Sequence, residues 1–147
     1  MSPVEPAVPA VPASPSEITF HIFPTDCDML GHLNHATMLG FLERARWAAF
    51  EHTLSLQQVL SAPVIPVVRQ VDIGYPAQMP LGADLTVRSG ILKVGNTSFT
   101  VRQEARNAAT GVVVAEANLV IVAIDRQGKP VRVPDAWIAT MAIWPAP

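Results

Sequence analysis

The chain has 147 residues, of which 50% are hydrophobic, and ten basic and twelve acidic residues give it a formal net charge of −2. This length predicts a single domain with one core. The basic residues are scattered along the chain, so the positive cluster that a nucleic-acid partner requires is missing. The large apolar fraction in so short a chain predicts that it associates with further copies of itself.

The first sixteen residues, MSPVEPAVPAVPASPS, have proline at every third position and no basic residue. We expect residues 1–16 to be a disordered tail and not a signal peptide, with residues 17–147 forming the domain. The single cysteine, Cys27, excludes a disulfide within the chain and fits a reducing, cytoplasmic setting. The longest apolar run, residues 112–124, contains two polar residues and is too short to span a membrane.

The apolar and polar residues alternate in several segments and predict the order of the elements. A strand is expected at residues 18–22, then a long helix from residue 36 onward, and then strands at 67–75, 83–93, 97–107 and 112–124, with a short addition at 131–133. Residues 54–63 are left without an assigned structure. One strand, one long helix and about four strands joined by hairpins predict an α+β fold with an antiparallel sheet. The helix is apolar around most of its circumference, so we expect the sheet to curl about it.

A short acidic loop, Asp26-Cys27-Asp28, comes shortly before the helix. Asn34 suits the N-cap, where its side-chain oxygen accepts the amide of Thr37. The amides of His35 and the following residue, Ala36, are then expected to lack partners. A carboxylate facing such amides could attack or hydrate a carbonyl whose oxygen the amides hold.

The other two members of the acidic loop receive structural interpretations. We expect Asp26 to bond the loop itself and Cys27 to be a small buried residue. The two flanking aspartates raise the pKa of the Cys27 thiol and make it a poor nucleophile.

The pattern D-x-D-x-x-G-H-x-N-H-A at residues 26–36, followed by F-L-E-R-A-R at 41–46, resembles the hotdog-fold acyl-CoA thioesterases of the 4-hydroxybenzoyl-CoA thioesterase type. Weaker matches follow in the same order at residues 75–77, 81–85 and 95–99. The resemblance implies a hotdog fold, in which a curled sheet wraps one long helix and protomers pair edge to edge. It also implies hydrolysis of an acyl-CoA thioester by a homodimer or homotetramer with active sites between protomers.

The resemblance assigns roles to individual residues. Asp28 corresponds to the catalytic carboxylate, and His35 contributes its backbone amide to the thioester oxygen and, in some family members, its imidazole. The expected substrate-binding residues are Gly31, His32, Asn34, Thr97 and Ser98. No metal or organic cofactor is expected. Met38 departs from the tyrosine of many relatives, and the family's glycine-aspartate pair is spread over residues 82–84.

Several alternatives remain open. A carboxylate and two histidines near the helix start could suggest a metal site, but they lack a recognised ligand spacing. Glu43 stands where some hotdog thioesterases place a carboxylate, and we prefer to read it as a partner of Arg44 or Arg46 at a protomer contact.

The sequence does not separate acyl-CoA from acyl-carrier-protein thioesters. A non-catalytic acyl-CoA-binding module and a hydratase are disfavoured. Candidate cations for the coenzyme A phosphates are Arg88, Lys93, Arg102 and Arg126.

Overall fold

A computed structural model describes residues 14–51 and 54–145, so most of the predicted tail lies outside the described residues. In this part of the chain the strands are β1 (Ser16–His21), β2 (Val64–Gly74), β3 (Asp84–Val94), β4 (Ser98–Asn107) and β5 (Val113–Asp125). The helices are α1 (His35–Glu51), α2 (Leu56–Ser61) and α3 (Asp135–Ile138), and a 3-10 turn, η1, covers Pro24–Asp26.

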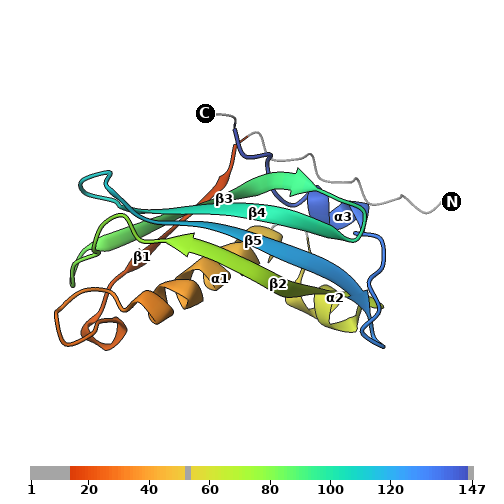
Figure 1. The fold of residues 1–147 in the computed structure, drawn as a ribbon, viewed down its shortest axis with the longest axis horizontal. Coiled ribbons are helices and arrows are strands. Elements are labelled where there is room, and N and C mark those ends of the chain that lie inside the picture. Colours follow the sequence, from red (N-terminus) through yellow and green to blue (C-terminus); the bar gives the residue numbers. More distant parts are fainter. Residues whose placement is uncertain (1–13, 52–53, 146–147) are drawn as a thin grey trace, which may run out of the picture.

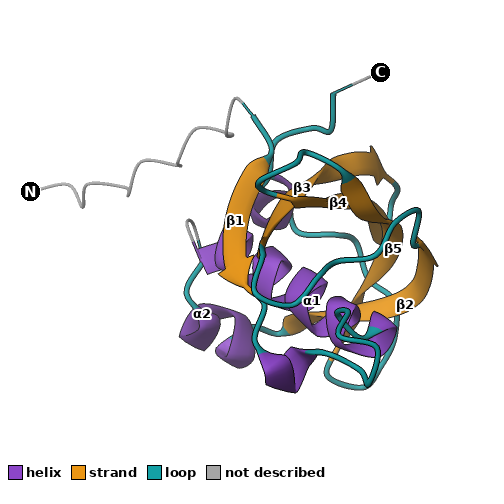
Figure 2. Cartoon of the chain, turned by 90° about the vertical axis from the view of Figure 1, so that its left-hand side faces the viewer, coloured by secondary structure: helices purple, strands orange, loops and turns teal. Residues whose placement is uncertain are grey.

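The five strands form one antiparallel sheet in the order β1-β3-β4-β5-β2, which leaves β1 and β2 at the edges. Figure 1 shows α1 lying along one face of the sheet. The view turned by 90° shows the strands curving around α1 (Figure 2). This arrangement confirms the predicted α+β fold with a sheet wrapped about a long helix.

Strand β4 shows how the sequence pattern sets the two faces of the sheet. Phe99, Val101, Gln103 and Ala105 are buried, and the residues between them are half-buried. Because successive strand residues point to opposite faces, one face of β4 packs on α1 and the other carries polar side chains. The predicted alternation is confirmed here.

A buried polar network crosses the core between α1 and the sheet. Arg46 donates from Nη1 to Oε1 of Gln103 at 3.0 Å, and Gln103 donates from Nε2 to the carbonyl of Leu42 at 2.8 Å and to the hydroxyl of Ser89 at 2.9 Å. Arg46 is only 8% exposed, and burial lowers the pKa of its guanidinium. Arg46 is one of the two arginines named above as partners for Glu43, and its hydrogen bond goes to Gln103 of β4.

The structure differs from the sequence-based elements in four places. First, residues 56–61 form α2, and its N-cap Ser55 accepts the amide of Gln58 through the side-chain oxygen. Second, α3 was not predicted. No strand forms at 131–133. Strand β2 begins three residues before the predicted 67, and includes Pro66, which an edge strand tolerates because one side of its backbone pairs with no strand.

The chain after β5 packs against the sheet near the C-terminal end of α1 and runs beside β3. The amide of Ile91 donates to the carbonyl of Ala142 at 2.8 Å, and the amide of Trp144 donates back to the carbonyl of Ile91 at 2.7 Å. A side chain at Gly90 would meet the Ala142 carbonyl at 3.1 Å, so glycine permits this close approach. Trp137 of α3 is buried among apolar residues from α1 and the sheet. The core therefore extends under both halves of the helix.

Candidate active site

The loop before α1 is a tight turn fixed on two sides. The amide of Asp28 donates to the carbonyl of His32 at 3.0 Å, and the amide of Gly31 donates to the carbonyl of Asp28 at 3.1 Å. Gly31 has φ +78°, a left-handed conformation that glycine adopts without strain. The neighbouring segment binds the turn through Leu81, whose amide donates to the Gly31 carbonyl at 3.1 Å, and through Met79. The loop is thus held in one conformation.

The two aspartates of the loop have different surroundings. The Asp26 carboxylate accepts the amide of Phe23 at 2.9 Å, and its carbonyl accepts the amide of Asn34 at 3.0 Å. This confirms Asp26 as a loop-bonding residue. The Asp28 carboxylate accepts the amide of Leu30 through Oδ1 at 2.9 Å and lies at an exposed position. Its second oxygen accepts no hydrogen bond from the described residues, so it is available for chemistry.

The first turn of α1 leaves one backbone donor unused. Asn34 Oδ1 accepts the amide of Ala36 at 2.8 Å and that of Thr37 at 3.2 Å. The expected cap on Thr37 is confirmed, whereas the expectation of a free Ala36 amide was wrong because one side-chain oxygen accepts both donors. Within residues 14–51 and 54–145, no group accepts the amide of His35.

A cavity of about 360 Å³ opens in front of this turn. Asp28, His32 and His35 line it together with Met38, so the structure brings these predicted residues to one space. Gly31 and Asn34 shape the loop behind it. His32 contributes a buried Nδ1 atom that has no hydrogen-bond partner among the described residues.

Thr97 and Ser98 do not reach this cavity within one protomer. Ser98 begins β4 and is paired with Val122, which is paired with Val67 near the start of β2. The cavity lies instead beyond the end of β2, where Gly74 is followed by Tyr75. Figure 1 shows α1 beginning at the end of the sheet opposite the β3–β4 turn. The binding role of Thr97 and Ser98 therefore remains a prediction.

Tyr75 is a member of the site that the sequence did not single out. Its hydroxyl donates to the backbone carbonyl of His35 at 2.6 Å. The centroids of the Tyr75 and His35 rings are 6.3 Å apart, and the two rings are perpendicular, in an edge-to-face arrangement. Burial raises the pKa of the phenol. The only signal in the sequence was its place in the weak match at residues 75–77.

Cys27 is half-buried, so the expectation of a small buried residue was wrong. Burial first, and then the charges of Asp26 and Asp28, raise the pKa of the thiol, which confirms the predicted direction. The sulfur donates to the carbonyl of Phe23 at 3.6 Å. Its contacts are those of a structural residue.

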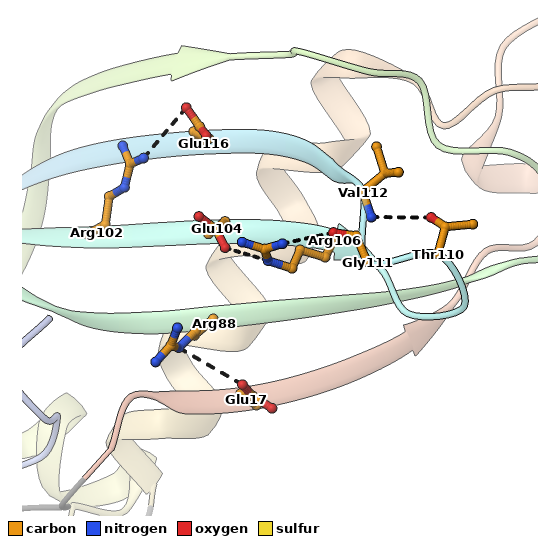
Figure 3. Close-up of polar contacts among 9 residues, drawn as sticks. All are labelled: Glu17, Arg88, Arg102, Glu104, Arg106, Thr110, Gly111, Val112 and Glu116. Atoms are coloured by element: carbon orange, nitrogen blue, oxygen red, sulfur yellow. Dashed lines mark hydrogen bonds and ion pairs between the residues drawn. The ribbon is translucent and has the colours of Figure 1, made fainter. Parts of the chain in front are cut away.

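Most of the candidate cations for coenzyme A already have partners. On the face of the sheet away from α1, Arg88 and Arg102 lie 4.0 and 3.6 Å from the carboxylates of Glu17 and Glu116 (Figure 3). Arg126 donates to the carbonyls of residues 60 and 62. Arg88 and Arg102 are therefore parts of a solvated sheet surface, and Arg126 ties the chain after β5 to the end of α2.

The described residues offer neither a metal site nor a membrane-crossing helix. No group of three or more histidine, cysteine, aspartate or glutamate side chains there is arranged to hold a metal ion. None of the helices in residues 14–51 and 54–145 combines the length and apolar character that a membrane crossing requires.

Known proteins of one enzyme class are similar to this chain. A family model described as the thioesterase-like superfamily matches residues 22–141. The long-chain acyl-CoA thioesterase FadM of Escherichia coli K12 is 33% identical over 98 residues, which cover 67% of this chain and 74% of that protein. The acyl-CoA thioester hydrolase YbgC of Escherichia coli O6:H1 is 30% identical over 120 residues, covering 80% of this chain and 89% of that protein.

Among solved structures, the crystal structure of the probable thioesterase YbaW from Escherichia coli has a TM-score of 0.77 and 26% identity to this chain, covering 86% of this chain and 98% of that one. The protein described here belongs to the thioesterase-like superfamily. The predicted hotdog fold and the predicted class of enzyme, a thioester hydrolase, are both confirmed by these matches.

Proposed function

We propose that the protein hydrolyses acyl-CoA thioesters in the cavity at the start of α1. The observation that carries the proposal is that Asp28 and His35 line one cavity, while the Asp28 carboxylate keeps a free oxygen and the His35 amide has no acceptor among the described residues. A thioester carbonyl placed between them has its oxygen on the amide and its carbon within reach of the carboxylate. Two relatives of this chain carry acyl-CoA thioester hydrolysis in their names, which supports coenzyme A as the carrier.

The proposed reaction begins with attack of an Asp28 oxygen on the thioester carbon. The carbonyl electrons move to the oxygen held by the His35 amide, and their return expels the coenzyme A thiolate. The resulting acyl-aspartyl anhydride takes up one water, which yields the free acid and restores the carboxylate. One Asp28 oxygen accepts no hydrogen bond from the described residues and is free to attack the thioester carbon, so we favour this route over activation of water by the same group.

Rapid acid quench of the enzyme in single turnover, followed by intact-protein mass analysis, distinguishes the two routes. The covalent route predicts a transient mass increase equal to the acyl group, localised to the peptide that contains Asp28. A burst of free thiol without any acylated protein would contradict the covalent route and favour general-base hydrolysis.

We further propose that the active enzyme is a homo-oligomer paired through β2. This edge strand exposes Val67, Val68 and Val71, and two cavities of about 330 and 290 Å³ lie between it and α1. Unpaired edges and apolar grooves of this kind favour association. Antiparallel pairing of two β2 strands sets the start of one beside the end of the other. The β3–β4 turn with Thr97 and Ser98 then lies at the same end of the joint sheet as the partner's cavity.

Sedimentation at micromolar concentration tests this assembly, and we expect a dimer or a tetramer. Val68→Lys, which places a charge on the exposed edge, should yield monomers with greatly reduced turnover, whereas Val112→Lys, at an exposed position outside β2, should change neither property. An active wild-type monomer would contradict the proposal. The homotetrameric state and the cytoplasmic location remain predictions from the sequence.

The function is tested with a panel of aliphatic and aromatic acyl-CoA esters and acyl-carrier-protein thioesters, assayed for release of free thiol. We expect turnover of coenzyme A esters and loss of that turnover in Asp28→Asn. Faster turnover on the carrier-protein esters would shift the assignment to the alternative substrate. Stoichiometric binding of acyl-CoA without thiol release would favour a binding module.

A further inference from the structure

Tyr75 connects two parts of the fold that are distant in sequence. It directly follows edge strand β2, and its hydroxyl donates to the carbonyl of His35 in the first turn of α1 at 2.6 Å. The contact spans 40 residues of sequence. The phenol therefore ties the end of the edge strand to the backbone that presents the unused amide.

The peptide groups around His35 show what this tie does. On one side, the carbonyl of Asn34 accepts the amide of Met38 at 3.0 Å, and the amide of Asn34 donates to Asp26. On the other side, the amide of Ala36 is held by the Asn34 side chain, and the carbonyl of His35 is held by Tyr75. The His35 N–H lies in the plane that is held through the Asn34 carbonyl, and Tyr75 holds the next plane. Together the two contacts restrict rotation about the His35 Cα, and with it the direction of the N–H.

We propose that Tyr75 is a positioning residue that orients the His35 amide toward the reacting carbonyl and couples edge strand β2 to the active site. The inference rests on the proposed role of that amide in thioester hydrolysis. The phenol acts through the His35 backbone carbonyl, so the effect requires its hydroxyl and does not require the His35 ring.

The first test is Tyr75→Phe, which keeps the ring that lines the cavity and removes the hydroxyl. We expect kcat to fall about tenfold or more, because a misaligned donor loses part of its effect on the transition state, while KM and the melting temperature change little. The His35→Ala variant retains the backbone carbonyl, so adding Tyr75→Phe to it should lower kcat by the same factor as in the native enzyme. Loss of the Tyr75 effect in that background would show that the ring contact matters instead, and an unchanged kcat in Tyr75→Phe would overturn the proposal.

The second test uses the fact that Tyr75 is the only tyrosine of the chain. Growth on 3-fluorotyrosine therefore alters this phenol alone and lowers its pKa. Only the protonated phenol donates, and burial raises its pKa, so the native enzyme should keep kcat into the alkaline range. With fluorotyrosine the alkaline fall of kcat should move to lower pH. If Tyr75 only packs against its neighbours, the pH profile of kcat should be the same with fluorotyrosine. That result would overturn the proposal.

A third measurement does not depend on activity. In protein labelled with ¹⁵N only at histidine, the His35 amide resonance should shift in Tyr75→Phe, and it should titrate with the phenol absorbance of the native protein. An unmoved resonance would overturn the positioning role. If the resonance moves but neither native enzyme nor variant releases thiol, the contact stands and the proposed function fails.

Discussion

The two ends of α1 perform different tasks. At its first turn the helix borders the cavity that Asp28 and His35 both line, and the amide of His35 has no acceptor among the described residues. At its last turns Ala49 and Phe50 are buried in an apolar cluster with Trp137 of α3. The start of a helix necessarily carries unsatisfied N–H groups, whereas its later turns can be packed without polar cost once the sheet covers them.

The two ends of α1 thus separate reactivity from stability within one short domain. The reactive end is held by hydrogen bonds among loop atoms and stays open to substrate. The other end is closed by the C-terminal segment bound along β3, with Gly90 allowing the close approach. Substitutions at the closed end should mainly change the free energy of unfolding, and those at the open end should mainly change catalysis.

The largest effect is expected at the closed end. Trp137→Ala removes a buried aromatic side chain and should lower the free energy of unfolding by about 3–5 kcal/mol, measured by urea denaturation. Activity per folded molecule at low temperature should stay within about twofold, because the cavity lies at the far end of the helix. Ile143→Ala, at a position that is 74% exposed, is the matched control and should be nearly neutral. A large loss of kcat in folded Trp137→Ala would contradict the separation of the two ends.

At the open end, Asp28→Asn should lower kcat at least ~100-fold, or ~2.7 kcal/mol in the barrier, with the melting temperature unchanged. The amide oxygen can still accept the Leu30 amide, so the turn is kept while the anionic oxygen is lost. Asp26→Asn is the control and should affect stability more than catalysis, because the Asp26 carboxylate bonds the Phe23 amide. An equal loss of activity in well-folded Asp26→Asn would identify Asp26 as the catalytic carboxylate instead.

Asn34→Ala removes only the N-cap at the reactive end of α1 and should have a smaller effect. The amides of Ala36 and Thr37 then lose their acceptor, and thermal unfolding should show a loss of about 1 kcal/mol. Asn34→Asp preserves an accepting oxygen and should restore most of that stability. Equal stability of the alanine and aspartate variants would show that the cap contributes nothing.

The smallest effect is expected from the N-terminal segment. Deletion of residues 1–13 should leave both the melting temperature and kcat unchanged, because a proline-rich segment with few large apolar side chains has little surface to bury. Differential scanning calorimetry and the thiol-release assay measure the two quantities on the same sample. A clear fall in either would assign this segment to the folded domain.

Local patterns were sufficient to predict much of this molecule. Strand periodicity predicted the alternating faces of β4, since the side-chain period of a strand is a local property. The spacing between Asp28 and His35 predicted their convergence because a tight turn and a helix start lie within a few residues of each other. The cap by Asn34 and the structural role of Asp26 depended on the same short-range geometry.

Tertiary structure decided the features that require atoms from distant segments. Arg46 is buried because Gln103, 57 residues away, meets it across the core, and Tyr75 holds His35 because the sheet brings the end of β2 to the start of α1. Conversely, Thr97 and Ser98 lie away from the cavity of their own protomer. Sequence periodicity reports which face of an element is apolar, but only the packed chain determines which buried polar group finds a partner.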